Sequence, residues 1–308
     1  MRRGHVAAGE AAMATAELVT PSFRPDFAQC AHLCASVDAF AAPGIRHTVI
    51  VPRRDLPRFA PLGNARREVR AVEDAAPLAA RQLPWFERNW ILDGARFVRG
   101  RIVQQIVKIA VAAQSDAEAV VLADSDVFFV RPFAVADFVR DGRVRFHRAT
   151  EGGHLFPRWN RTACRLLGIP ERAQQDAGFV SPLACWEPGL VRSMCARIAD
   201  ASGRPWASAI ARQGAFSEFA TYGIFVEQVE AAAEARQWPA PPLCHVSWGF
   251  DLDKGAERDR FVDAVDQQRI AVCIHSNLGL PAPVVTDLWA RIGARARADA
   301  QGLSRRQP

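Results

Sequence analysis

Two aspartates one residue apart, Asp124 and Asp126, carry the strongest chemical signal in this sequence. They follow a continuous apolar run at 119–123, which is typical of a strand buried on both faces. In open α/β sheets, ligands bind beyond the carboxyl ends of the strands. If the segment stays extended, its alternate side chains lie on one face, so both carboxylates converge on one hard cation. We predict a metal site here, with Ser125 beside it, that neutralises a pyrophosphate leaving group. The alternative is a turn or cap without a ligand.

A helix is predicted just upstream, at about 101–113, because its apolar residues form a broad face. Its remaining stripe contains Arg101, Gln104, Gln105 and Lys108, which we expect to contact a cofactor. The chain has 39 Lys and Arg residues, and only Lys108 and Lys254 are lysines. A lysine in an arginine-rich chain is less interchangeable with another cation. The alternative for Lys108 is an amphipathic-helix lysine whose head group extends to water.

The rest of the chain alternates between strand-like and helix-like segments, which predicts a parallel sheet flanked by helices. The first strand, 17–22, ends in Thr20, Pro21 and Ser22, and we expect this loop to contact the same cofactor. Residues 77–100 resemble a long, partly helical connection. Further strands are predicted at 47–51, 68–72, 143–149, 177–184 and 270–274, and further helices at 26–40, 157–167, 188–199 and 219–235.

Composition narrows the class of protein. A chain of 308 residues that is 49% hydrophobic can bury a large core. No stretch approaches the roughly 18–20 apolar residues of a membrane-spanning helix, so we expect no transmembrane segment. The formal charge of +6 is scattered, without basic runs or an aromatic stripe, which gives a nucleic-acid partner little support. Seven cysteines without a CxxC pair indicate neither a zinc site nor a disulfide framework, and predict reduced thiols in a cytoplasmic protein.

The residues around the acidic pair resemble a known family. The stretch KIAVAAQSDAEAVVLADSDVFFVRPF, residues 108–133, is similar to the lysine-bearing helix, apolar strand and DxD motif of glycogenin-like family 8 glycosyltransferases. Four later stretches resemble an uncharacterised bacterial family of predicted glycosyltransferases: DAGFVSPLACW (176–186), GRPWASAIAR (203–212), FSEFATYGIFV (216–226) and AVCIHSNLGLP (271–281). Together these resemblances cover most of residues 18–281.

The resemblance implies a GT-A fold and a metal-dependent transfer of sugar from a nucleotide-sugar to an unknown glycan or small-molecule acceptor. UDP-sugars are among the donors it suggests, and Mn²⁺ or Mg²⁺ is the implied cofactor. Lys108 lies 16 residues before Asp124, the spacing of that family's phosphate-contacting lysine. We expect one GT-A-like domain at 17–285, with a nucleotide-sugar half at 17–133 and an acceptor half at 134–285. Residues 1–16 are expected to be a disordered extension, and 286–308 a C-terminal helix or tail.

A third metal ligand is implied by the resemblance alone. A C-terminal histidine commonly completes the metal site of GT-A enzymes, and His275 ends the last predicted strand. The sequence departs from family 8 here, because Gly279 comes four residues after His275 instead of three and no Lys-Pro-Trp follows. His245 competes for the role, and a histidine at a strand end is often a hydrogen-bonded structural residue.

Glu218 is the first candidate for a catalytic base, since a carboxylate at a pocket wall can remove the proton of an acceptor hydroxyl. Asp176 is its rival. In the structural alternative, Ser217 caps a helix and Glu218 is merely an acid in its first turn.

Two other functions remain open at this stage. Asp124 and Asp126 could serve as nucleophile and acid in a phosphatase of the haloacid dehalogenase type. Such enzymes usually begin with this strand, and they need a downstream acidic pair, for which Asp251 and Asp253 are the available substitutes. The second alternative is a non-catalytic nucleotide-sugar-binding protein.

Overall fold

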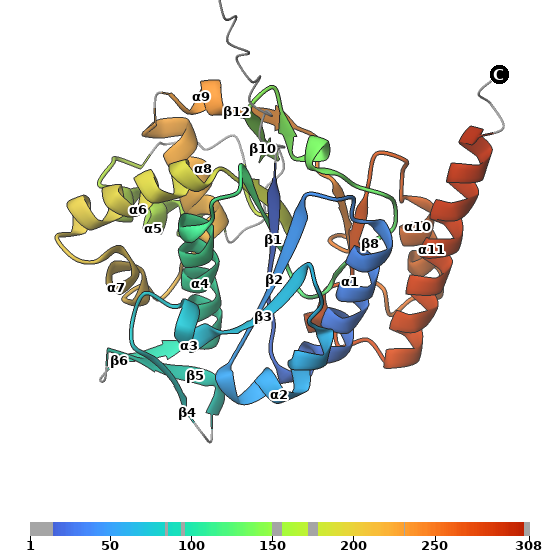
Figure 1. The fold of residues 1–308 in the computed structure, drawn as a ribbon, viewed down its shortest axis with the longest axis horizontal. Coiled ribbons are helices and arrows are strands. Elements are labelled where there is room, and N and C mark those ends of the chain that lie inside the picture. Colours follow the sequence, from blue (N-terminus) through green and yellow to red (C-terminus); the bar gives the residue numbers. More distant parts are fainter. Residues whose placement is uncertain are drawn as a thin grey trace, which may run out of the picture.

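A five-stranded sheet forms the centre of the fold within the residues that the structure describes. The computed structural model describes residues 15–83, 86–93, 96–149, 156–171, 178–230 and 232–304. The strands of the central sheet are β1 (Ala16–Pro21), β2 (Ile45–Val51), β3 (Arg67–Ala71), β7 (Ala119–Ala123) and β11 (Leu183–Trp186). Their order is β11-β7-β1-β2-β3 (Figure 1). Neighbours pair in parallel except β11, which runs antiparallel to β7. The protein is therefore α/β, with a mixed sheet that has a parallel core.

Two long helices cover the two faces of this sheet, α1 (Phe27–Phe40) and α4 (Gly100–Gln114) (Figure 1). Successive strand residues point to opposite faces. Val19 and Leu122 accordingly lie in one hydrophobic cluster with the buried residues of α4. Leu18 and Val121 lie in another with Leu33 of α1. Because both faces are covered at the centre of the sheet, β7 is apolar and buried along its whole length, as the run at 119–123 predicted, whereas the edge strand β3 carries charged residues.

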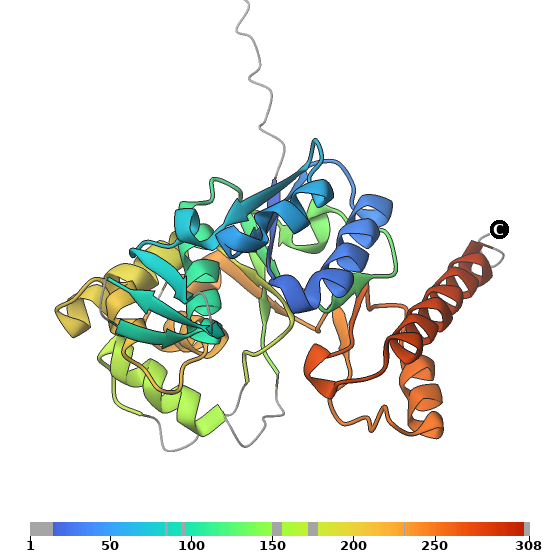
Figure 2. The same cartoon turned by 90° about the horizontal axis from the view of Figure 1, so that it is seen from below.

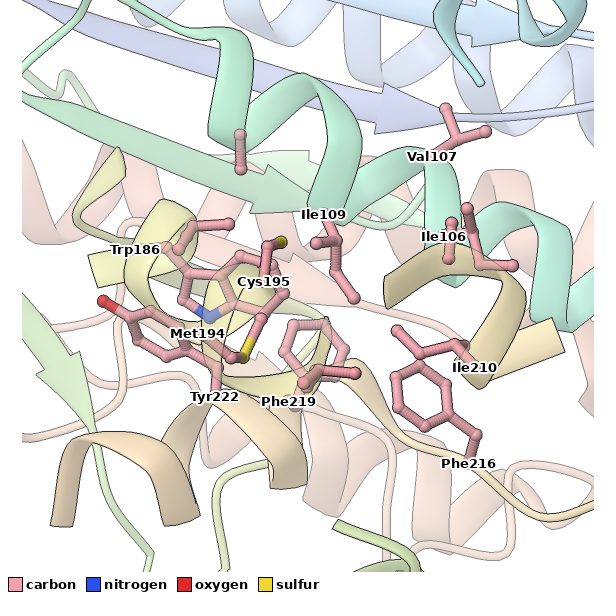
Figure 3. Close-up of a cluster of buried hydrophobic side chains, with 14 of the residues drawn as sticks. Ile106, Val107, Ile109, Trp186, Met194, Cys195, Ile210, Phe216, Phe219 and Tyr222 are labelled. Carbon is pink, nitrogen blue, oxygen red and sulfur yellow. The ribbon is translucent and has the colours of Figure 1, made fainter. Parts of the chain in front are cut away.

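A second helical layer packs against the side of α4 that faces away from the sheet. It contains α6 (Pro188–Ser202), α7 (Trp206–Ala211) and α8 (Glu218–Gln228). Figure 3 shows Ile106 and Ile109 of α4 among Met194, Ile210 and Phe219 of this layer. The broad apolar face predicted for α4 thus reflects a helix buried between two layers.

A second, smaller sheet continues from the central one. It consists of β8 (Val127–Phe129), β14 (Ala271–Cys273) and β13 (Cys244–Val246), in the order β13-β14-β8. Helices α10 (Gly255–Asp263) and α11 (Ala282–Ser304) cover its outer side (Figures 1 and 2). Trp289 of α11 stacks on His32 of α1 with ring centroids 3.8 Å apart, which joins this C-terminal part to the central fold. The predicted C-terminal helix therefore begins at Ala282, a few residues earlier than expected.

The remaining elements are short or peripheral. They are α2 (Leu56–Phe59), α3 (Val72–Ala75), β4 (Ala80–Leu83), β5 (Phe86–Leu92), β6 (Arg96–Arg99), β9 (Val139–Arg140), β10 (Arg143–His147), α5 (Phe156–Leu167), α9 (Ala233–Arg236) and β12 (Gln237–Ala240). No helix within the described ranges combines the length and apolar character needed to cross a membrane.

Three segments differ from the sequence prediction. The segment predicted as a partly helical connection, 77–100, contains the antiparallel sheet β4-β5-β6 instead. Only its inner side chains, such as Trp90 and Val98, are buried, so its period of two is weak in the sequence. The strand predicted at 177–184 begins only at Leu183, because Pro182 cannot donate a ladder hydrogen bond. The helix predicted at 219–235 ends at Gln228, and the short α9 follows.

Candidate active site

The acidic pair lies at the junction of the two sheets. β7 ends at Ala123, β8 begins at Val127, and the Val127 amide donates to the Asp124 carbonyl oxygen across 3.0 Å. The predicted position at the carboxyl end of β7 is thus correct, but the pair sits in a tight turn and not in an extended segment. The two carboxylates are close enough across this turn for the charge of Asp124 to act on Asp126.

A cleft of about 710 Å³ opens at this turn. Its wall includes nine residues selected from the sequence as candidate site residues: Pro21, Arg101, Gln104, Gln105, Lys108, Asp124, Ser125, Asp126 and Glu218. They come from the end of β1, the first half of α4, the β7–β8 turn and the start of α8. Elements far apart in the sequence therefore converge on one cavity.

Lys108 is buried between two carboxylates of this cleft. Its Nζ atom lies 2.7 Å from Asp124 Oδ1 and 3.0 Å from Glu218 Oε1, and 4.7 Å from the centre of the Phe219 ring. Burial by itself would lower the pKa of Lys108, but the two carboxylates outweigh that effect and the pKa is raised. The alternative of a head group extended to water is wrong, because the ammonium is enclosed and paired.

Asp126 is held from the opposite side by the C-terminal sheet. Its Oδ2 atom accepts the Ser276 amide at 2.9 Å, and its Oδ1 atom lies 3.4 Å from Cys273 Sγ. Burial, followed by the charge of Asp124, raises the pKa of Asp126, while Ser276, His275 and Cys273 oppose the rise. Two carboxylates that repel each other in a partly dry site would be stabilised by a cation between them.

Glu218 is both the first residue of a capped helix and a buried residue of the cleft wall. Ser217 caps α8, since its Oγ atom accepts the Ala220 amide at 3.2 Å, and Glu218 is the first residue of the helix. Its side chain is nevertheless buried, lines the cleft and pairs with Lys108. An acid that only stabilised the first turn of the helix would not need to be buried in the cleft wall. The rival candidate, Asp176, lies outside the described residues.

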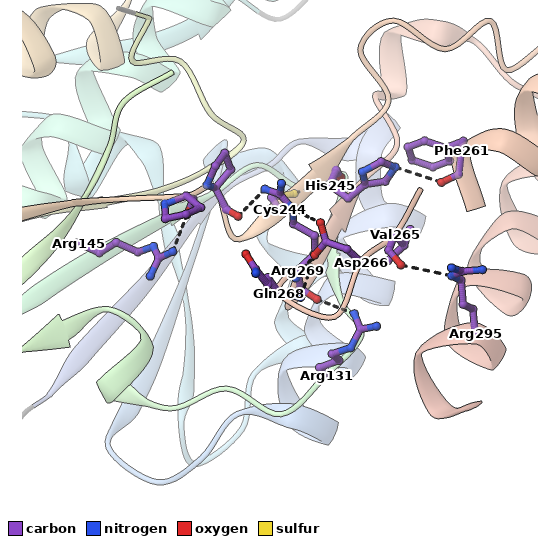
Figure 4. A network of polar contacts seen from close by, with 12 residues as sticks. Arg131, Arg145, Cys244, His245, Phe261, Val265, Asp266, Gln268, Arg269 and Arg295 are labelled. Carbon is purple, nitrogen blue, oxygen red and sulfur yellow. Dashed lines mark hydrogen bonds and ion pairs between the residues drawn. The ribbon is translucent and has the colours of Figure 1, made fainter. Parts of the chain in front are cut away.

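The two candidate histidines have different surroundings. His245 does not line the cleft: its Nε2 donates to the Phe261 carbonyl oxygen at 3.1 Å, and its ring stacks on Phe261 (Figure 4). His275 directly precedes the cleft residue Ser276, and its Nδ1 lies 2.8 Å from Ser247 Oγ. His245 is therefore a structural residue, and His275 is the histidine beside the acidic pair.

A set of arginine contacts fixes the residues just before β14, the strand that leads to His275. Arg131, which follows β8, donates to the Arg269 carbonyl oxygen at 2.6 Å (Figure 4). Arg269 in turn bonds Asp266, in the connection between β13 and β14, and the carbonyl oxygen of Pro242, which precedes β13. The loop at 274–277 is held against the β7–β8 turn by two amides, since Ile274 donates to the Asp126 carbonyl oxygen and Ser276 donates to Asp126 Oδ2.

The loop after β1 contributes less to the cleft than predicted. Thr20 is fully buried, with its Oγ1 atom 3.1 Å from His47 Nε2, so it belongs to the interior of the sheet. Ser22 lines an adjoining cavity of about 540 Å³, whose wall also includes Trp90 and Val72. The two cavities share Phe23, Arg101 and Gln104.

Several residues of the cleft were missed from the sequence. Asp26 lines it and accepts a 3.4 Å hydrogen bond from Ser125, and Trp159 and Asn277 line it as well. Asp26 could have been found, because it follows the carboxyl end of β1, where ligands of α/β sheets bind. Trp159 lies on α5 and has no comparable signal.

The described wall of the cleft carries four carboxylates, Asp26, Asp124, Asp126 and Glu218, against two cations, Arg101 and Lys108. The formal charge of the described wall, two minus four, is −2.

No three His, Cys, Asp or Glu side chains among the described residues cluster closely enough to bind a metal ion by themselves. Asp251 and Asp253, the acids a phosphatase would need, do not line this cleft, and Asp251 pairs with Lys254. Within the described residues, the cleft thus offers carboxylate oxygens as metal ligands but no group of three such ligands.

Comparison with known proteins assigns a family without an activity. Residues 17–240 match the model of a family of unknown function, DUF6492, and the chain belongs to that family. No curated protein matches the sequence.

Proposed function

We propose that this member of DUF6492 is a metal-dependent glycosyltransferase of the GT-A type, which transfers a sugar from a nucleotide-sugar to a hydroxyl acceptor. One observation carries the proposal: Asp124 and Asp126 leave the end of a central parallel strand into a 710 Å³ cleft that also contains the buried Lys108. Ligands of open α/β sheets bind at this edge. The resemblance to family 8 around the acidic pair points the same way.

The charge of the cleft supports a role for a divalent cation. A nucleoside diphosphate is an anion, and the described wall already has a formal charge of −2. A diphosphate would be repelled unless a cation accompanied it. The donor set fits Mg²⁺, which is usually bound by one or two carboxylates together with substrate phosphates, so a third protein ligand is not required. Asp124 and Asp126 would hold the ion, which would stabilise the departing diphosphate.

The first turn of α4 would receive the phosphates. This helix begins at Gly100, and the side chain of its N-cap residue, Arg99, makes no capping hydrogen bond. Unsatisfied amides and the helix dipole favour an anion at such an end. Arg101 and Gln104 of this turn line both cavities. The more apolar cavity, bounded by Trp90 and Val72, would then accommodate the nucleoside, with the sugar directed toward Lys108 and Glu218.

Glu218 is the residue we assign to proton transfer. Its carboxylate lines the cleft, and Lys108 of α4 fixes one of its oxygens. The acceptor hydroxyl would give its proton to Glu218 as its oxygen bonds to the sugar and the diphosphate leaves. Direct displacement of this kind inverts the anomeric centre, whereas the family 8 resemblance points toward retention.

Calorimetry with UDP and GDP, in Mn²⁺ and in chelator, tests the metal-dependent donor site. We expect binding in Mn²⁺ that is lost in chelator, and Asp126→Ala should abolish the difference with little loss of fold. The matched control is Asp251→Ala, which removes an exposed carboxylate outside the cleft wall. Equal affinity in Mn²⁺ and chelator would refute the metal-bridged site.

Turnover assays distinguish the alternatives. Release of nucleoside diphosphate from a panel of nucleotide-sugars identifies a transferase, and binding without release would indicate a non-catalytic nucleotide-sugar-binding protein. Hydrolysis of p-nitrophenyl phosphate, lost in Asp124→Asn, would instead support the phosphatase.

A further inference from the structure

An exposed tryptophan stands next to the cleft on the C-terminal side. Trp248 follows β13 and is 53% exposed, although large aromatic side chains are usually buried. Leu278, also exposed, lies in the neighbouring turn at 276–278. Both residues lie beyond the segment that the family model matches, which ends at residue 240.

The orientation of this indole is fixed. Its ring stacks on His275, with centroids 5.4 Å apart and an interplanar angle of 16°. His275 is itself held by the buried Ser247, whose Oγ atom lies 2.8 Å from Nδ1 and accepts the His275 amide at 3.3 Å. Gly249, with φ of +80°, and Gly279, with φ of +66°, adopt the left-handed conformation that lets both loops turn here. An exposed ring held this way loses little conformational entropy when a ligand covers it.

The same loop connects the indole to the acidic pair. Ser276 and Asn277, next to His275, line the cleft. The Ser276 amide donates to Asp126 Oδ2 at 2.9 Å. The exposed ring is therefore one stacked histidine away from residues that line the cavity containing Asp124, Lys108 and Glu218.

We propose that Trp248 is the stacking platform of an acceptor subsite, and that the acceptor is a saccharide. This inference rests on the proposed transferase activity, since it identifies the class of acceptor for the same cleft. A sugar ring has a C–H face that packs on an aromatic ring and hydroxyls at its edge that need hydrogen bonds. Trp248 offers the first kind of surface, and Ser276 and Asn277 offer the second. A protein or lipid partner would need a wider apolar surface than one indole and Leu278 provide.

Fluorine NMR tests the subsite without requiring turnover. The protein is labelled with 5-fluorotryptophan, and the Trp248 signal is assigned by its absence in Trp248→Phe. Maltotriose, cellotriose, chitotriose and xylotriose are then titrated to millimolar concentrations in the presence of UDP and Mn²⁺. We expect at least one of them to shift the Trp248 signal in a saturable way. No shift with any of the four would overturn the proposal.

Kinetics separate the subsite from the donor site. With the saccharide that shifts the signal, Trp248→Ala should raise the acceptor KM about tenfold or more and leave the donor KM unchanged, and Trp248→Phe should recover part of the loss. Phe97→Ala is the control, because Phe97 is exposed on β6 outside the cleft wall. Saccharide binding at Trp248 without any turnover would refute the transferase but keep the subsite. Turnover with an unchanged acceptor KM in Trp248→Ala would refute the subsite alone.

Discussion

Replacing Lys108 by methionine tests how the centre of the cleft is held together. Methionine keeps the apolar stem of the side chain and removes the ammonium, so it creates little cavity. The ammonium bonds Asp124 Oδ1 at 2.7 Å and Glu218 Oε1 at 3.0 Å. Its loss leaves both carboxylates without their nearest cation.

The two carboxylates should contribute unequally to the loss of stability. The Asp124 side chain is 38% exposed, so water can take over much of its solvation and its pairing adds little. The Glu218 side chain is only 3% exposed. Breaking a buried pair by removing one partner costs about 3–5 kcal/mol, because the other charge stays buried. We expect Lys108→Met to lower the free energy of unfolding by that amount, nearly all of it through Glu218.

Urea unfolding followed by circular dichroism measures this loss, and a second substitution identifies its origin. Lys108→Met/Glu218→Gln should regain about 2–3 kcal/mol relative to Lys108→Met, because the amide needs no counter-charge. The control is Lys254→Met, which removes the chain's other lysine from an exposed pair with Asp251 and should cost at most about 1 kcal/mol. A loss below about 1 kcal/mol in Lys108→Met, or strict additivity in the double variant, would refute the reasoning.

Three further outcomes follow from single residues. Burial, and then the charge of Arg67, lowers the pKa of His47 to about 3. Below pH ~6.5 the unfolded chain therefore binds a proton that the folded chain does not, so the free energy of unfolding should fall as pH drops, by about 2 kcal/mol at pH 5. Urea unfolding of His47→Gln should show a smaller fall. Gly223→Ala should destabilise by about 1–3 kcal/mol in the same assay despite alanine's helix propensity, because the new Cβ would lie 2.0 Å from the Phe179 ring; unchanged stability would contradict the packing. Glu218→Gln should reduce turnover about 10²-fold or more with nucleotide binding intact, and NMR of the product should show inversion; a retained configuration would exclude Glu218 as the base.

The parts of the fold that could be predicted from the sequence are those where the pattern of apolar residues is compatible with only one kind of element. The apolar run at 119–123 is long and flanked by polar residues, and it is the central strand β7. The apolar face of α4 predicted a buried helix for the same reason. By contrast, β4-β5-β6 has few buried positions, and its pairing joins short strands by turns, so no window of the sequence contains enough alternation to show it.

The candidate site was predictable where residues lie near strand ends, and less so where tertiary contacts decide. The sequence indicated that Lys108, Asp124 and Glu218 could each carry chemistry, but spacing cannot show that they meet, because Glu218 is 110 residues from Lys108. Thr20 and Ser22 are only two residues apart, yet Thr20 is buried inside the sheet and Ser22 lines the cavity next to the cleft, a difference that the sequence does not show. Trp248 was not singled out, since exposure is invisible in the sequence.

The position of Lys108 bears on how the two halves of the cleft depend on each other. Its ammonium carries one positive charge and bonds one carboxylate from the β7–β8 turn and one from α8. A cation that binds Asp124 must therefore share that carboxylate with Lys108 or displace the ammonium toward Glu218. Either change alters the electrostatic surroundings of the carboxylate that we assign to proton transfer. Binding of the metal and its diphosphate would thus be coupled to Glu218 through a single side chain, without any movement of the backbone.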